Sequence, residues 1–106
     1  QICEADVAAS FQKAVIDALV EHSLHAVKKH GYKKFAIAGG VASNSSLRGA
    51  FEQECAKRRI EFYHPSPIYC TDNAAMIGVA GYYEYQKGAR SGLDLNAVPN
   101  LKLGER

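Results

Sequence analysis

Apolar residues recur along the first part of this chain at steps of three and four, which is typical of one face of an amphipathic helix. The pattern predicts a helix over residues 5–29. Its apolar stripe comprises Val7, Phe11, Ala14, Val15, Ala18, Leu19, His22 and Ala26. Gly31 follows a basic turn and is predicted to end this helix, because glycine readily adopts the left-handed conformation of a helix stop.

Two short segments further along the chain predict strands. Residues 33–38 (KKFAIA) are apolar in their second half and lie between helical patterns, which predicts a buried parallel strand. Residues 60–63 (IEFY) alternate and predict a second strand. Between them, residues 44–59 predict a helix with a narrow apolar stripe.

The remaining third of the chain predicts a loop, one helix and a tail. Prolines at positions 65 and 67 predict a loop over residues 64–70, because proline disrupts both helices and interior strands. Residues 71–86 predict a third helix, with Thr71 as its N-cap. We therefore expect an α/β region over residues 1–88 and an irregular tail over residues 89–106.

The order helix, strand, helix, strand, helix predicts an α/β fold with parallel strands and right-handed crossovers. Two strands alone make a poor sheet, and the sequence begins without Met in a helical pattern. We therefore expect this chain to be a piece of a longer protein, with further strands upstream.

Composition narrows the class of protein. The chain has 106 residues, of which 47% are hydrophobic and 23% charged, which indicates one globular domain. Cys3, Cys55 and Cys70 form no C-x-x-C pair, so neither a cysteine metal site nor a disulfide framework is indicated. Unpaired thiols fit a reducing compartment, and Cys55 and Cys70 are expected to be buried. The sequence has no membrane-spanning run and no signal peptide, so we expect a cytoplasmic protein without a membrane partner.

The stretch AGGVASN offers the first candidate chemistry. Glycines at the carboxyl end of a strand let a ligand approach the backbone, and the following helix start attracts anions. Gly39 and Gly40 are therefore candidate ligand-binding residues. Ser43, Asn44 or Ser45 is expected to cap the helix, and Asn44 is alternatively a ligand contact. This stretch alone favours a tight turn with a cap, since it matches neither a Walker loop nor G-x-G-x-x-G.

The second turn, PSPIYCTDNAAM, places Asp72 after the second strand. This carboxylate is either a first-turn helix acid or a metal ligand, and one carboxylate does not hold a metal alone. His22 and His25 are expected to be solvated or packed rather than metal ligands.

Two further groups of residues have a structural and a nucleic-acid interpretation. The cations at 57–59 favour stabilisation of a helix end over contact with RNA phosphates. The tyrosines of the third helix favour packing against the body of the protein over stacking on bases. These tyrosines are Tyr82, Tyr83 and Tyr85.

Both turns taken together resemble a known family. AGGVASNSSLR, followed by P-x-P-x-x-CTDNAAMIG, AGYYEY and LDLNAVPNL, is similar to the C-terminal part of the tRNA threonylcarbamoyladenosine transferases, bacterial branch. This family was formerly labelled O-sialoglycoprotein endopeptidase, or glycoprotease. The opening DVAASFQKAVIDALV resembles the family's preceding helix, so the resemblance covers nearly the whole chain.

The resemblance implies an actin-like, sugar-kinase-like ATPase fold with two RNase H-like lobes, of which this chain forms part of the second. It implies that the full-length enzyme transfers threonylcarbamoyl from threonylcarbamoyl-adenylate to the adenosine next to the anticodon of tRNA. Gly39 and Gly40 would then lie against the adenylate, Asn44 would contact the nucleotide, and Asp72 would bind the metal.

The resemblance further implies one divalent metal ion, iron or zinc, with two more ligands from an upstream H-x-x-x-H motif. His22 and His25 have the wrong spacing for this motif, so we expect an incomplete site and no turnover by this chain alone. The implied partners are a paralogous subunit, an ATPase subunit and a carbamoyl-adenylate synthase. The alternative functions are a metalloprotease, after the older label, and a non-catalytic lobe that binds a nucleotide or a partner.

Overall fold

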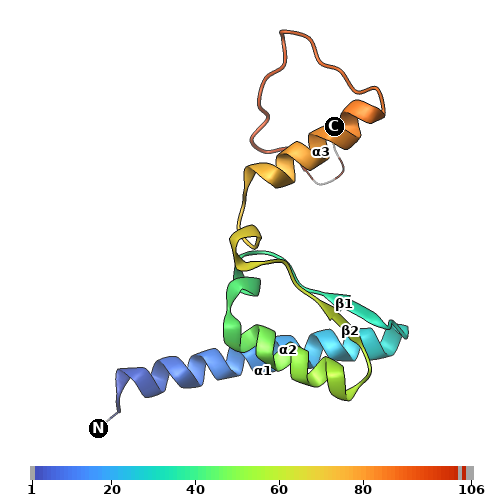
Figure 1. Ribbon diagram of the computed structural model, residues 1–106. Coiled ribbons are helices and arrows are strands. Elements are labelled where there is room, and N and C mark those ends of the chain that lie inside the picture. The colour runs from blue at the N-terminus through green and yellow to red at the C-terminus, as the bar shows by residue number, and fades with distance from the viewer. Residues whose placement is uncertain (1, 103, 105–106) are drawn as a thin grey trace. The chain divides into compact units, whose positions relative to one another are not determined.

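A computed structural model describes residues 2–102 and 104 (Figure 1). The chain divides into two compact units, Gln1–Asp72 and Asn73–Arg106, and each is described by itself. The expected boundary after residue 88 separates the helical region from the tail, and it stays a prediction.

The first unit is a small parallel α/β structure. Its elements in order are α1 (Glu4–His30), β1 (Lys34–Ala36), the 3-10 helix η1 (Gly40–Ser43), α2 (Ser45–Lys57), β2 (Glu61–Tyr63) and the 3-10 helix η2 (Pro67–Tyr69). The two strands pair in parallel, with Phe35 opposite Phe62 in the register. The predicted α/β class with parallel strands is confirmed, and the predicted proline loop contains one short 3-10 turn.

Local signals fix the end of α1. Gly31 has φ 70° and ψ 20°, the left-handed conformation predicted for it. Its N–H donates to the Lys28 carbonyl at 3.2 Å, and the Tyr32 N–H donates to the Val27 carbonyl at 3.1 Å. These two bonds satisfy carbonyls of the last helical turn, so the predicted helix stop is confirmed.

The core lies between α2, the second half of α1 and one face of the sheet. Its buried apolar residues are Leu24, Val27, Ala42, Leu47, Phe51, Cys55 and Cys70. The ring of Phe51 lies 5.0 Å from that of Phe35 and 5.7 Å from that of Phe62, between centroids. Each strand therefore points its central side chain at α2, and the predicted burial of Cys55 and Cys70 is confirmed.

The predicted apolar stripe of α1 is not its buried face. Val7, Phe11 and Leu19 are 55%, 72% and 41% exposed, whereas Leu24 and Val27 are buried. The helix is much longer than α2, and in this unit it packs against α2 through a different side. The periodicity identified the apolar residues of α1, but it did not predict which side of the helix packs against α2.

The strands are also less buried than predicted. Phe35 and Phe62 are half-buried, whereas Lys34, Ala36, Glu61 and Tyr63 are exposed on the other face. Parallel sheets are usually covered on both faces, which was the basis for predicting a buried strand. In the described part of the first unit, helices cover one face only.

The second unit contains α3 (Ala74–Gln86) followed by turns without helix or strand. Asn73, not Thr71, is the N-cap, because its side chain accepts the Met76 N–H at 3.2 Å. The prediction of Thr71 as the cap was therefore wrong. Residues 89–102 and 104 contain no helix or strand, and the other positions of the predicted tail lie outside the described residues.

The tyrosines of α3 are not buried within the second unit, and their packing against the body of the protein stays a prediction. Tyr82, Tyr83 and Tyr85 are between 58% and 61% exposed, and no residue of α3 is buried. The Arg90 guanidinium lies 3.7 Å from the centroid of the Tyr85 ring, a cation–π contact.

Among the residues described, no helix is both long and apolar enough to cross a bilayer.

Candidate ligand site at the strand-to-helix turns

The glycine turn follows β1 directly. The Ile37 N–H donates to the Tyr63 carbonyl at 3.0 Å, and the chain leaves the sheet beyond this bond. Gly39 has φ 89° and ψ 173°, a conformation almost restricted to glycine. Gly39 and Gly40 are both exposed, so a ligand has access to their backbone. The turn therefore requires a glycine at position 39 and leaves the carboxyl end of the strand open.

Side chains attach this turn to α2. The Ser43 hydroxyl donates to the Gly40 carbonyl at 2.6 Å. The Arg48 guanidinium donates to the carbonyls of Ala42 and Ser43 at 3.0 and 2.7 Å. This role of Arg48 was not predicted from the sequence, where the available signal was a cation one turn into the helix. These bonds hold the backbone of the turn in a fixed position relative to the helix start.

Asn44 is the N-cap of α2. Its Oδ1 accepts the Leu47 N–H at 3.0 Å, and its Nδ2 donates to Gln12 Oε1 on α1 at 3.1 Å. Of the three capping residues considered, the structure selects Asn44. The Gln12 contact joins residues 32 positions apart, so no local pattern indicated it. An amide nitrogen carries two hydrogens, and Gln12 accepts from only one of them.

The second turn lies beside the first. A Cβ built on Gly40 would stand 3.9 Å from Thr71 Cγ2, which is ordinary van der Waals contact. The two turns are therefore neighbours within the first unit (Figure 1). Asp72 directly follows Thr71 and is exposed. That its carboxylate faces the same cavity as Asn44 stays a prediction.

The described residues do not form a complete metal site. Nowhere in residues 2–102 or at 104 do three or more His, Cys, Asp or Glu side chains gather in a way that would hold a metal ion. His22 is exposed, and its Nδ1 lies 2.8 Å from the Ala18 carbonyl, to which a protonated Nδ1 donates. His25 is exposed on the same helix. Asp72 alone supplies one carboxylate, so this chain's residues do not fit an entire metal centre.

Two of the grooves along α1 differ in their lining and in their distance from the glycine turn. The first has a volume of about 230 Å³ and adjoins the glycine turn, since Val41 and Asn44 contribute to its wall. Apolar side chains dominate this wall, with the amides of Asn44 and Gln12 as the polar groups. The second groove, of about 600 Å³, runs between α1 and α2 and contains none of the predicted site residues.

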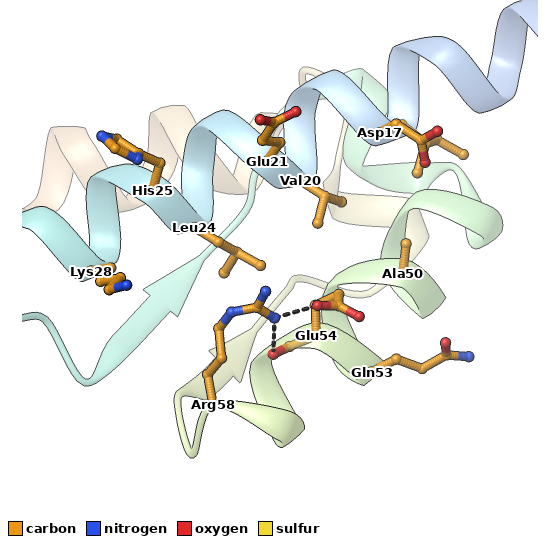
Figure 2. A pocket seen from close by; sticks show the side chains of 11 residues that line it. Asp17, Val20, Glu21, Leu24, His25, Lys28, Ala50, Gln53, Glu54 and Arg58 are labelled. Carbon is orange, nitrogen blue, oxygen red and sulfur yellow. Dashed lines mark hydrogen bonds and ion pairs between the residues drawn. The ribbon is translucent and has the colours of Figure 1, made fainter.

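Figure 2 shows the charged lining of the second groove. Arg58 donates to the Glu54 carbonyl at 2.9 Å and to its carboxylate. Lys57 donates to the same carboxylate at 2.5 Å. Hydrogen bonds from Lys57 and Arg58 lower the pKa of Glu54 to about 2. Lys57 and Arg58 therefore share Glu54 as their partner at the end of α2, and the stabilisation of the helix end by all three cations stays a prediction.

The fold is that of an α/β protein with parallel strands. Its candidate site lies at the carboxyl ends of these strands, where the open glycine turn and the second turn are neighbours. The sequence identifies the family. Residues 1–79 match the sequence model of tRNA N6-adenosine threonylcarbamoyltransferase. The chain belongs to this family, which confirms the resemblance.

Curated relatives from Clostridium agree. The chain is 58% identical over 105 residues to a protein of Clostridium kluyveri, covering 99% of this chain and 31% of the relative. It is 59% identical over 106 residues to a protein of Clostridium botulinum strain Hall, covering 100% of this chain and 31% of the relative. Both relatives are named tRNA N6-adenosine threonylcarbamoyltransferase. The chain thus spans about a third of their length.

Proposed function

We propose that the protein carrying this chain transfers a threonylcarbamoyl group from threonylcarbamoyl-adenylate to an adenosine of tRNA, next to the anticodon. Family membership over residues 1–79 and identities of 58–59% to named transferases support this function. The observation that supports it is the proximity of the two turns, since a Cβ built on Gly40 would lie 3.9 Å from Thr71 Cγ2 and Asp72 directly follows Thr71 in the chain. The rest of the actin-like lobe would lie in the part of the protein outside this chain.

The glycine turn and the start of α2 would hold the adenylate. Backbone N–H groups at a helix N-terminus attract an anionic phosphate, and Gly39 leaves their approach open. Asn44 has one amide hydrogen beyond the one that Gln12 accepts, and this hydrogen would contact the nucleotide. Because an acyl adenylate is already activated, the protein would accelerate transfer mainly by positioning it against the tRNA.

Asp72 would contribute one carboxylate to a divalent metal, iron or zinc, whose other ligands lie outside this chain. Asp72→Asn in the full-length protein should lower the bound metal measured by elemental analysis at least tenfold. Asp94→Asn, an exposed acid of the second unit, is the control. Wild-type metal content in the Asp72 variant would exclude this residue as a ligand. In this proposal the protein is cytoplasmic and works with the paralogous, ATPase and synthase subunits.

Asn44→Asp tests the adenylate site while sparing the helix cap. Aspartate keeps the oxygen that accepts the Leu47 N–H but removes both amide hydrogens. In the full-length protein we expect at least a tenfold loss of threonylcarbamoyl-adenylate affinity by calorimetry and a matching loss of tRNA modification, with an unfolding midpoint close to wild type.

Asn73→Asp is the matched control, because Asn73 makes the same capping bond at α3. It should leave adenylate affinity unchanged. Equal affinities for the Asn44 variant and the wild type would contradict the proposed site.

A further inference from the structure

Positive charge gathers at one end of the first unit, where α1 leads into β1 and α2 leads into β2. Seven of the chain's thirteen Lys and Arg residues lie in segments 28–34 and 57–59. We call them the basic cluster: Lys28, Lys29, Lys33, Lys34, Lys57, Arg58 and Arg59. All seven are exposed. The remainder of the chain carries all eleven acidic residues and only six cations. The small net charge of +2 therefore conceals an uneven distribution of charge along the chain.

The fold brings the two segments together. Lys34 is the register partner of Glu61, and the Glu61 N–H donates to the Lys33 carbonyl at 2.8 Å. Lys28 and Arg58 line the same groove between α1 and α2 (Figure 2). Because both connections enter the sheet at the amino ends of parallel strands, the cluster lies at the opposite end of the strands from the glycine turn.

Part of this charge has no partner among the residues that the structure describes. Lys57 and Arg58 bond Glu54, and Lys34 lies 3.7 Å from Glu61. Over the described part of the chain, no hydrogen bond or ion pair involves the side chains of the other four, and none belongs to the residues with further contacts. These four are Lys28, Lys29, Lys33 and Arg59. Their charges are available to an external anion.

The backbone at Arg59 argues against a purely structural role. Arg59 has φ 56°, the left-handed conformation, at the position after the α2 C-cap. The Ile60 N–H donates to the Cys55 carbonyl at 2.9 Å, which closes a stop normally formed by glycine. An arginine is strained there, so the fold alone would favour glycine. Strained backbone conformations cluster at functional sites, so the strained position of Arg59 within an exposed basic cluster points to a ligand.

An exposed aromatic residue lies in the same segment. Tyr32 is 64% exposed, and its ring stacks on His30 with centroids 6.0 Å apart. Exposed aromatic rings among cations are typical of surfaces that bind nucleic acid, because bases stack on them. Asp17 and Glu21 line the same groove as Lys28, toward the start of α1, and mark where the positive surface ends.

We propose that the basic cluster binds the phosphate backbone of the tRNA substrate. This inference rests on the proposed function, since it assigns the substrate a second contact surface away from the glycine turn. Lys29, Lys33 and Arg59 would pair with phosphates, and Tyr32 would stack on an accessible base. The contacts hold the tRNA in place and carry no sequence information.

The test uses the full-length protein and an unmodified tRNA transcript, with affinity measured by filter binding between about 50 and 200 mM salt. The patch variant combines Lys29→Gln, Lys33→Gln and Arg59→Gly. We expect at least tenfold weaker binding, and a log–log salt slope shallower by about two to three, since each phosphate contact contributes roughly one. Arg59→Gly alone should weaken tRNA binding and raise the unfolding midpoint, because glycine relieves the strain at this position. If Arg59 had only a structural role, tRNA binding would not weaken in the more stable variant.

The control variant removes three charges outside the cluster, by Lys13→Gln, Lys87→Gln and Lys102→Gln. Wild-type tRNA affinity and salt slope in the patch variant, or an equal loss in the control, would overturn the inference. The inference would also be overturned if the patch variant bound tRNA like the wild type but had lost binding to phosphatidylserine vesicles. Calorimetry with threonylcarbamoyl-adenylate separates the two proposals, because its affinity should not change in the patch variant. Absence of tRNA modification by the wild-type protein would instead refute the proposed function.

Discussion

At the scale of single residues, Asn44 shows that a capping role and a ligand role are compatible. Its Oδ1 caps α2 by accepting the Leu47 N–H. Its Nδ2 donates one hydrogen to Gln12 Oε1, and the second amide hydrogen remains for a further partner. The sequence predicted the cap because capping depends on the residue type and its near neighbours. It did not predict Gln12, because that contact depends on how α1 packs against the helix start.

The two glycines of the turn should respond differently to the same substitution. Gly39 has φ 89° and ψ 173°, so Gly39→Ala should destabilise the chain by about 1–3 kcal/mol. At Gly40 the added Cβ would meet Thr71 Cγ2 at an ordinary 3.9 Å, so Gly40→Ala should change stability by less than about 0.5 kcal/mol. Urea denaturation of both variants measures the difference. Equal losses would show that the backbone of position 39 is not the constraint.

At the scale of elements, the sequence predicted what local chemistry decides. It predicted the stop at Gly31, the helix–strand order and the parallel pairing, since glycine, caps and alternation act within a few residues. It mislocated the start of α3, because Thr71 and Asn73 are both good caps and only the path of the chain selects one. The buried side of α1 and the open face of the sheet depend on which partners are present, which a local pattern does not encode.

Two leucines of α1 test which side of the helix carries its stability. Leu24 is 5% exposed in the core, and Leu19 is 41% exposed on the predicted stripe. Leu24→Ala should destabilise this chain by about 2–5 kcal/mol, because it leaves a cavity. Leu19→Ala should cost less than about 1 kcal/mol. The measurement is urea unfolding followed by circular dichroism, and a larger loss for Leu19 would mean that the predicted stripe is the packed face.

At the scale of the whole molecule, burial is confined to one unit. Every buried residue among those described, from Leu24 to Cys70, belongs to Gln1–Asp72. The second unit begins with α3, which has no buried residue. A helix with no buried residue gains little from packing, and isolated helices of this length are marginal in water. Stability of the described chain therefore arises in its first unit.

This distribution predicts opposite behaviour for the two halves prepared separately. Residues 1–72 should unfold cooperatively, with a urea midpoint close to that of the 106-residue chain, since all the described core residues are retained. Residues 73–106 should give a circular dichroism spectrum dominated by unfolded chain, because none of the 13 residues of α3 is buried. The comparison needs both pieces at equal molar concentration and a third sample in which they are mixed. A strongly lowered midpoint for residues 1–72, restored on mixing, would show that the second unit stabilises the first through contacts that the isolated halves lack.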